Sequence, residues 1–484
     1  MLGGLAAARG ASAAPPRQAR PPNLLFIITD QQRYDTLACY RDTGLNMPNL
    51  NALARRSTVF QRHYVTHAVC TPSRSSIMTG RCSHNTGCVH NNIPLPGDML
   101  CLPEMLPANT FKSGHFGKWH LGDEIFAQHG FDVWKATEDA YIPHYSPQRD
   151  RNARSAYHHW LISRGVSLPA GQDRFGRHDA ANLPEALGKP AFIVNQVSAF
   201  IRDAAADGKP FVAFASFLEP HNPYHGPRDA QYEPAEIPLP PNFNHEFGPD
   251  DFFKWKRIQR RLRRKGFHGI PLKDQADWRQ LISRYWGLCS LVDTHVGRIL
   301  EALRESGQGD NTIIVFTSDH GDMMGSHRLI TKNKPFDESA RVPFILHLPG
   351  QRRQREIAVP TSSVDLAPTL VDCLGFADRL PEDLDGSSLR PVLAGNGEPA
   401  DVVMEWNNWG KKDPRPRSIV SQNLWKLTYG ANGAYELYDL STDPFEMVNL
   451  VNEARNRPRM QKLVRRIRDW QIRTGDSTLL PELA

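Results

Sequence analysis

The chain has 484 residues, of which 40% are hydrophobic and 23% are charged, and its formal net charge is +6. These fractions are typical of a soluble globular protein, and no apolar run approaches the roughly 18 residues that a membrane-spanning helix needs. They exclude transmembrane, collagen-like and largely disordered proteins, and at about 150 residues per domain the length suits two or three domains.

The first segment, residues 1–21, is rich in Ala and Pro and is interrupted by Arg. Its apolar stretch is short and no basic region precedes it, which makes it a poor secretory signal. We therefore predict a disordered leader and a cytoplasmic protein, with a periplasmic or secreted location left open.

Three short runs are apolar throughout, and a carboxylate follows each within two residues: residues 23–29, 211–217 and 312–318. Such runs are typical of strands buried on both faces, as in a parallel or mixed sheet covered by helices. Helical patterns lie between them, at residues 48–56, 191–206 and 281–303. This alternation predicts an α/β fold with a large mixed, mostly parallel sheet sandwiched between helices.

Much of the basic excess lies in one run, residues 254–265, with the sequence KWKRIQRRLRRK. We favour a solvated helix face for this run, and a docking surface for a polyanion is the alternative. A nucleic-acid-binding protein usually adds a recognition motif. None is found, so we expect no nucleic-acid partner.

The composition changes after about residue 375, where Gly, Pro and Asp become frequent. Short strand-like segments follow, at residues 418–420, 424–429 and 435–438, and a basic amphipathic pattern predicts a helix at 457–472. We therefore predict a catalytic domain over residues 22–375 and a smaller α+β subdomain over residues 376–484, formed by an antiparallel sheet and this helix.

Polar residues stand where two of the predicted strands end: Asp30-Gln31 and Asp319-His320. Ligands in open α/β sheets gather beyond the carboxyl ends of strands, so we expect these side chains to meet. Carboxylate and amide oxygens suit Ca²⁺ or Mg²⁺, and a histidine leaves Mn²⁺ open as well. The alternative is that each aspartate only caps a loop.

Cys70 opens the segment CTPSRSSIMTGR. Pro72 followed by serines predicts a helix start. This places Cys70 at or just before a helix N-terminus, where free N–H groups favour an anion, and Arg74 shares its face. The pattern indicates an activated thiol or an oxyanion site, with a buried structural cysteine as the alternative. The seven cysteines include no C-x-x-C pair, so neither a disulfide framework nor a zinc cluster is expected.

Four further residues could carry chemistry: Lys118 and His120 in GKWHLG, His221 in EPHNPYH, and Lys332 in RLITKNKPFDES. Taken singly, such residues are more often surface or satisfied core residues. The motifs of P-loop enzymes, zinc proteases and serine hydrolases with a nucleophile elbow are absent from the sequence.

Together these segments resemble the type I sulfatases of the alkaline-phosphatase superfamily. The similarity runs in order through TDQQRYDTL, MPNLNALA, CTPSRSSIMTGR, GKWHLG, EPHNPY, VDTHVGRIL, FTSDHGDMMGSH, RVPFILHLPG and YELYDLSTDPFEMVNL. Nine collinear segments are far more specific than any one of them. The D-Q and D-H pairs, where many sulfatases have a second carboxylate and an Asn, look more like the subgroup of choline sulfatases, arylsulfatases and phosphonate monoester hydrolases.

The resemblance implies that Cys70 is oxidised after translation to formylglycine, by a formylglycine-generating enzyme, and that its hydrate is the nucleophile. It also implies a divalent cation, for which we favour Ca²⁺ and leave Mn²⁺ and Mg²⁺ open. The implied ligands are Asp30, Gln31, Cys70, Asp319 and His320.

The resemblance also implies roles for the cationic residues and the histidines. Arg74, Lys118 and Lys332 would neutralise the sulfate oxygens. His120 would stand beside the formylglycine and assist sulfate release, and His221 would protonate the leaving alcohol. Lys334 is a neighbour of Lys332, which we prefer because it lies four residues before Phe336.

We therefore expect a sulfatase that hydrolyses a sulfate monoester of a small molecule or a saccharide. The first alternative is a phosphonate monoester hydrolase or phosphodiesterase on the same scaffold. The second is a non-catalytic polyanion-binding protein that uses residues 254–265. An oligomer is left open, and no readable pattern identifies the organic part of the substrate.

Overall fold

The structure is a computed structural model that describes residues 20–248, 251, 253–397, 400–407, 415–431 and 433–483. The predicted leader, residues 1–21, therefore lies almost entirely outside the described residues. None of the helices within these ranges has both the length and the apolar character needed to cross a membrane.

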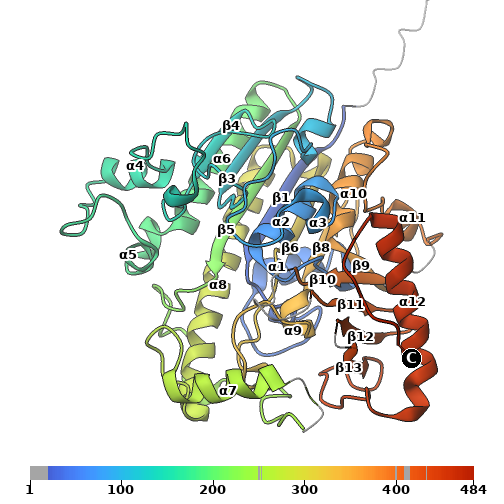
Figure 1. The fold of residues 1–484 in the computed structure, drawn as a ribbon. Helices are drawn as coiled ribbons and strands as arrows, with labels where there is room; N and C mark the ends of the chain where they lie inside the picture. The colour runs from blue at the N-terminus through green and yellow to red at the C-terminus, as the bar shows by residue number, and fades with distance from the viewer. Residues whose placement is uncertain are drawn as a thin grey trace, which may run out of the picture.

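A nine-stranded sheet forms the centre of the molecule (Figure 1). Its strands are β1 (Asn23–Asp30), β2 (Thr58–Tyr64), β3 (Lys112–Gly117), β4 (Val133–Ala136), β5 (Phe211–Pro220), β6 (Thr312–Ser318), β7 (Arg341–Val342), β8 (Phe344–His347) and β9 (Arg355–Ser362). The order is β4-β3-β5-β1-β6-β8-β2-β7, and β9 pairs with β2. The first five strands in this order are parallel, as are β2 and β9, whereas β8 is antiparallel to both neighbours and β7 to β2.

Helices cover both faces of this sheet because its central strands are apolar on both sides. On one face, Leu25 and Ile27 of β1 belong to a core with α1 (Pro48–Ala54), α6 (Lys189–Ala206) and α8 (Gln275–Glu305). On the other, alternate residues of β1 belong to a core with α2 (Cys70–Thr79) and α10 (Leu366–Cys373). The predicted mixed, mostly parallel sheet between helices is confirmed.

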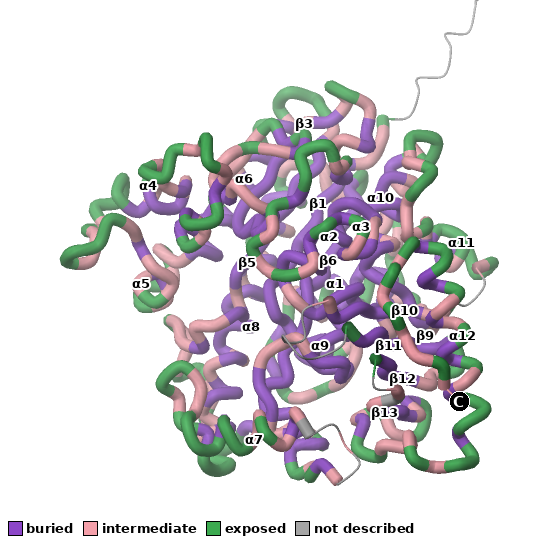
Figure 2. Tube along the Cα trace, in the orientation of Figure 1, coloured by how far each residue is buried: buried purple, intermediate pink, exposed green. Residues whose placement is uncertain are grey.

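Shorter helices connect these layers: α3 (Ser83–Thr86), α4 (Ala156–Ser163), α5 (Arg177–Ala181), α9 (Asp337–Ala340) and α11 (Arg390–Leu393). The basic run forms α7 (Phe253–Lys265), in which Trp255 and Leu262 are buried while arginines on the other side are exposed. Figure 2 shows the central strands β1 and β6 buried and α7 largely exposed. The run is thus a helix with a solvated basic face.

A second sheet lies in the C-terminal part of the chain. It is antiparallel, in the order β10 (Val402–Glu405), β11 (Arg417–Val420), β12 (Trp425–Gly430) and β13 (Gly433–Asp439). The final helix, α12 (Arg457–Thr474), shares a core cluster with this sheet. The predicted antiparallel sheet with a helix is confirmed, although the sequence does not single out β10. The division at residue 375 remains a proposal.

Candidate active site

The ends of β1 and β6 bring the two polar pairs together. The strands are parallel neighbours in which Thr29 pairs with Ser318, so Asp30 and Asp319 leave the sheet at the same edge. The start of α2 places the Cys70 Sγ 3.8 Å from Asp30 Oδ1 and 3.2 Å from His320 Nε2. The ligand atoms of Asp30, Cys70, Asp319 and His320 all lie within 4.8 Å of one another, and all four residues are buried.

The ring of His320 is oriented toward this cluster. Its Nδ1 lies 3.0 Å from the Gly321 carbonyl oxygen, an acceptor, so Nδ1 carries the proton of the neutral ring. The lone pair of Nε2 then faces the nearer carboxylate oxygens of Asp30 and Asp319, at 3.7 and 3.5 Å. Burial lowers the pKa of His320, but negative charges led by Asp319 outweigh it and the net shift is upward, so a positive charge at Nε2 is favoured here. Carboxylate oxygens with one imidazole nitrogen fit a divalent cation.

Two buried cationic side chains already contact these carboxylates. The Arg74 Nε donates to Asp319 Oδ2 at 2.7 Å, and Lys118 donates to Asp30 Oδ2. Burial would raise the pKa of the Asp30 carboxyl, but the positive charges led by Lys118 hold it well below its usual range. Asp30 is therefore an anion at neutral pH, as a metal ligand must be.

Lys332 reaches the cluster through Gln31. Its Nζ donates to Gln31 Oε1 at 2.6 Å. The Gln31 Nε2 donates to Tyr224 Oη at 2.7 Å and to Asp322 Oδ2, which leaves the second lone pair of Oε1 for a ligand role. Lys334 instead donates to backbone carbonyls of its own loop, at 2.8 Å each. The structure thus places Lys332, and not Lys334, against the cluster.

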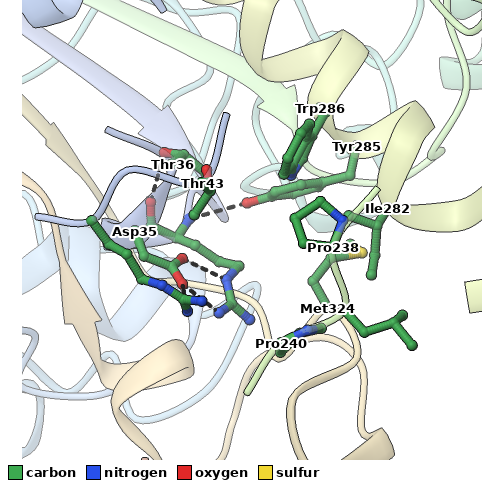
Figure 3. Close-up of a pocket in the computed structure, with 12 residues that line it drawn as sticks. Asp35, Thr36, Thr43, Pro238, Pro240, Ile282, Tyr285, Trp286 and Met324 are labelled. Atoms are coloured by element: carbon green, nitrogen blue, oxygen red, sulfur yellow. Dashed lines mark hydrogen bonds and ion pairs between the residues drawn. The ribbon is translucent and has the colours of Figure 1, made fainter. Parts of the chain in front are cut away.

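Contacts from α8 fix the backbone at Gln31, whose φ is 70°. The Tyr285 hydroxyl donates to the Gln31 carbonyl oxygen at 2.8 Å and accepts from the Arg33 backbone N–H at 3.0 Å. Figure 3 shows Tyr285 pointing from α8 toward this segment, beside a cavity that is lined by Asp35, Trp286 and Met324 among others. None of the predicted site residues lines that cavity.

His120 follows β3 and lies beside the start of α2. Its carbonyl oxygen accepts from Thr71 Oγ1 at 2.8 Å, and its Nε2 lies 2.9 Å from Asn92 Oδ1. The ring stacks on Tyr141, with centroids 4.2 Å apart. Burial and then the charge of Lys118 lower the pKa of His120 well below its ordinary value. His120 is therefore neutral at neutral pH.

His221 follows β5 on the other side of the site. Its Nδ1 lies 2.7 Å from the Asn222 carbonyl oxygen and must carry the proton, so Nε2 is the ring atom available to a substrate. Burial and then the charge of Lys332 lower the pKa of His221 well below its ordinary value. His221 is one of the residues that line a cavity with Arg177, Glu219 and His225.

Cys70 differs electrostatically from the other cysteines, all of which are free. Burial and Asp30 raise the pKa of its thiol, but Lys118, Lys332 and His320 outweigh them, and the net shift is downward. Burial instead raises the thiol pKa of Cys39 to about 12 and that of Cys88 to about 11. Cys70 therefore lies in the electropositive kind of environment where reactive cysteines occur.

Sequence reasoning misses several residues that support the site. Asn92 contacts His120, Tyr141 stacks on it, Ser216 accepts from Arg74 at 2.9 Å, and Tyr224 contacts Gln31. Only Tyr224 lies within a segment that carries the resemblance. Ser216 lies in the predicted strand 211–217, whose apolar pattern does not mark it as a site residue, and Asn92 and Tyr141 stand in loops without a readable pattern.

Comparison with known proteins gives two family matches. The model of the sulfatase family matches residues 22–376. The model described as the C-terminal region of N-sulphoglucosamine sulphohydrolase matches residues 325–473. The two matches overlap and together span both sheets.

Individual proteins align along most of the chain. An ulvan-active sulfatase of Formosa agariphila is 27% identical, over 89% of this chain and 77% of the relative. An N-acetylglucosamine-6-O-sulfatase of Bacteroides thetaiotaomicron is 26% identical, over 98% and 90%. The structure of a phosphonate monoester hydrolase from Silicibacter pomeroyi superposes with a TM-score of 0.77 at 25% identity, covering 95% of this chain and 96% of that one.

Proposed function

We propose that this chain cleaves sulfate monoesters with a formylglycine at position 70 and a divalent cation. The premise is that the chain belongs to the sulfatase family and is a sulfuric ester hydrolase. The observation that carries the proposal is the buried cluster of Asp30, Cys70, Asp319 and His320, whose ligand atoms lie within 4.8 Å of one another. A formylglycine-generating enzyme would convert Cys70. Family membership sets aside the non-catalytic alternative.

The cation would be held by Asp30, Asp319, His320, the Gln31 amide oxygen and an oxygen at position 70. We propose Ca²⁺ first, because the donor set is rich in oxygen, with Mn²⁺ and Mg²⁺ as alternatives. When bound, the cation would lower the pKa of a nearby hydroxyl and hold a sulfuryl oxygen, and the formylglycine hydrate would supply that hydroxyl.

The chain's own cationic residues would bind the sulfate group. Arg74, Lys118 and Lys332 surround the cluster, and each is already oriented by a hydrogen bond to Asp319, Asp30 or Gln31. Preoriented positive charges in a buried site stabilise charge that develops on oxygen in the transition state. The ester sulfate would therefore be held with its oxygens toward these three residues.

The two histidines would handle protons at different ends of the ester. The Nδ1 of His221 is held by the Asn222 carbonyl oxygen, so its Nε2 is available and would protonate the leaving alcohol. Because its pKa is lowered in the free protein, Nε2 needs the negative charge of a bound substrate to retain a proton near neutral pH. His120 would act beside position 70, where Asn92 and Tyr141 hold its ring, and assist sulfate release.

The test is an ester panel assayed with protein whose position 70 has been defined by peptide mass. Co-expression with a formylglycine-generating enzyme should raise activity on nitrophenyl sulfate and yield an aldehyde that reacts with hydrazide. Cys70→Ala should abolish turnover and leave the fold intact, whereas the matched control Cys39→Ala should retain it. Full activity of Cys70→Ala would overturn the mechanism.

Phosphonate monoester or phosphodiester hydrolysis is the second candidate function. Residue 31 is a neutral amide, so only two carboxylates contribute to the buried cluster. A more positive site is suited to any compact tetrahedral monoanion. The similarity in fold to a phosphonate monoester hydrolase supports this alternative, and comparing the aryl phosphonate rate with the aryl sulfate rate decides it.

The organic part of the substrate is proposed to be a saccharide. The N-acetylglucosamine-6-O-sulfatase named above supports this class.

A further inference from the structure

Arg177, the first residue of α5, lies beside the site but takes no part in the mechanism above. Its Nε donates to Glu138 Oε2 at 2.6 Å, and its Nη2 donates to Tyr141 Oη at 2.7 Å. In the part of the chain that the structure describes, no acceptor contacts Nη1. The side chain is 22% exposed, so Nη1 is open to a ligand that enters from solvent.

Arg228 shows what a purely structural arginine nearby looks like. Its Nε and Nη2 donate to both oxygens of Glu185, at 2.8 and 2.9 Å. Its Nη1 donates to the Ser290 carbonyl oxygen and to Thr294 Oγ1, at 2.9 Å each. All three of its nitrogens have protein acceptors, whereas Arg177 keeps one nitrogen without any among the described residues.

Arg177 is close to both histidines of the proposed mechanism. Its guanidinium carbon lies 5.5 Å from the centre of the Tyr141 ring, which stacks on His120. It lines the same cavity as His221. Since both histidines act on the ester in the proposed function, Arg177 lies on the side of the site toward which the organic part of the ester would extend.

The charges around this cavity favour an anion. Glu138 is buried and pairs with both Arg177 and Lys189, so the three groups leave one positive charge in excess. Glu185 is neutralised by Arg228. Burial raises the pKa of the Glu219 carboxyl to about 7, so Glu219 carries only part of its charge at neutral pH.

A guanidinium that is already fixed by two hydrogen bonds loses little conformational entropy when it binds a ligand. Its fork geometry matches carboxylates and sulfates. A neutral sugar hydroxyl would gain much less from such a contact than an anion.

We propose that Arg177 is a specificity residue that binds a second anionic group on the organic part of the substrate, next to the ester that is cleaved. The inference rests on the proposed function and names its substrate class: a sulfate ester that also bears a carboxylate or a further sulfate. Glu138 and Tyr141 position the guanidinium, and Nη1 makes the contact.

The experiment measures binding in the Cys70→Ala background, where the ester is not turned over. Calorimetry compares two matched pairs of probes: a hexuronic acid sulfate with the corresponding hexose sulfate, and glucosamine N,6-disulfate with glucosamine 6-sulfate. The protein should bind the more anionic member of at least one pair about tenfold more tightly or better. Which pair shows the preference identifies a carboxylate or a sulfate as the second group.

Arg177→Gln should reduce the ratio of the two affinities within that pair by about tenfold. A change that weakens both members of the pair equally leaves this ratio unchanged. Arg177→Lys should keep part of the preference, and the control Arg304→Gln should keep all of it, because Arg304 pairs with Glu301 and neither residue lines this cavity. Thermal unfolding of each variant checks that the fold is retained.

Equal binding of both members in each pair, or a preference that survives Arg177→Gln, would overturn the proposal. Neither result touches the proposed function, which fails separately if formylglycine-loaded protein hydrolyses no sulfate ester. The same preference measured as a ratio of kcat/KM values in loaded protein gives an independent readout.

Discussion

The carboxylate of Asp322 accepts a hydrogen bond from the side-chain amide of Gln31. The other oxygen of this carboxylate, Asp322 Oδ1, accepts from the backbone N–H groups of Met324 and Thr331, at 2.8 Å each. One carboxylate thus fixes the loop that carries Lys332 and turns the Gln31 Oε1 toward Lys332. This contact supplies a physical reason for an amide at position 31, because a carboxylate there would face Asp322 as a like charge.

Variants that move the negative charge from Asp322 to position 31 should show whether Asp322 excludes a carboxylate at position 31. Gln31→Glu places two carboxylates in contact, and we expect kcat/KM for nitrophenyl sulfate to fall by about tenfold or more. Adding Asp322→Asn should restore part of the loss, because its amide can donate to Glu at position 31 while its oxygen still accepts the two backbone groups. Steady-state kinetics of both single variants and the double variant give the coupling energy, and strictly additive losses would refute the explanation.

The neutral amide at position 31 also predicts the reaction scope. We expect wild-type protein to hydrolyse phosphonate monoesters or phosphodiesters measurably beside sulfate esters. A unit charge about 4 Å away is worth on the order of 4 kcal/mol at an effective dielectric near 20, so Gln31→Asp should depress the phosphorus reactions at least as much as the sulfate one. Absence of any phosphorus-ester activity in fully formylglycine-loaded protein would exclude this expectation.

The losses of activity caused by replacing His221 and His120 should depend differently on the leaving group of the ester. His221→Ala should slow alkyl sulfates far more than nitrophenyl sulfate, because only a poor leaving group needs a proton in the transition state. His120→Ala should instead slow the steps after alcohol release, which a burst of nitrophenol in stopped-flow measurements would reveal. Equal losses across leaving groups for His221→Ala would remove its assignment as the general acid.

Removal of the divalent cation should abolish activity without unfolding the protein. Arg74 and Lys118 contact Asp319 and Asp30 directly, so the carboxylates keep positive partners when no metal is bound. We expect chelation to stop turnover and to lower the thermal midpoint by only a few degrees, about the effect of 1 kcal/mol in a protein of ordinary size, with recovery on addition of Ca²⁺. Cooperative unfolding caused by the chelator alone would contradict this charge balance.

Buried histidines outside the proposed catalytic set should lower the stability at acid pH. Burial lowers the pKa of His63 and of His115 to about 3, and that of His67 to about 4. These rings stay neutral in the folded protein while the unfolded chain takes up protons below its ordinary histidine pKa of about 6.5. The free energy of unfolding should therefore fall as the pH drops from about 6.5 toward 4. Urea titrations of His63→Gln and wild type should show a shallower acid loss in the variant; identical slopes would exclude His63 as a contributor.

Much of the fold and of the site could be predicted because the informative residues stand in contiguous segments. The apolar runs that form β1, β5 and β6 are readable as strands buried on both faces, and Asp30 and Asp319 come directly after two of them. Weaker strands such as β10 and β4 have four residues each. A strand of only four residues is too short to show a clear hydrophobic period, and its pairing depends on strands that are distant in sequence.

The sequence by itself determined the candidate chemical groups of this protein: a cysteine at a helix start, acidic residues at strand ends and a set of lysines and histidines in family segments. Only the tertiary structure decided which atoms of these residues face one another. Gln31 and Asp322 are 291 positions apart, and Arg177 reaches the site through Tyr141, 36 positions away. Such contacts depend on side-chain rotamers and hydrogen-bond partners that exist only after the sheet has brought its strand ends together, and no local pattern encodes them.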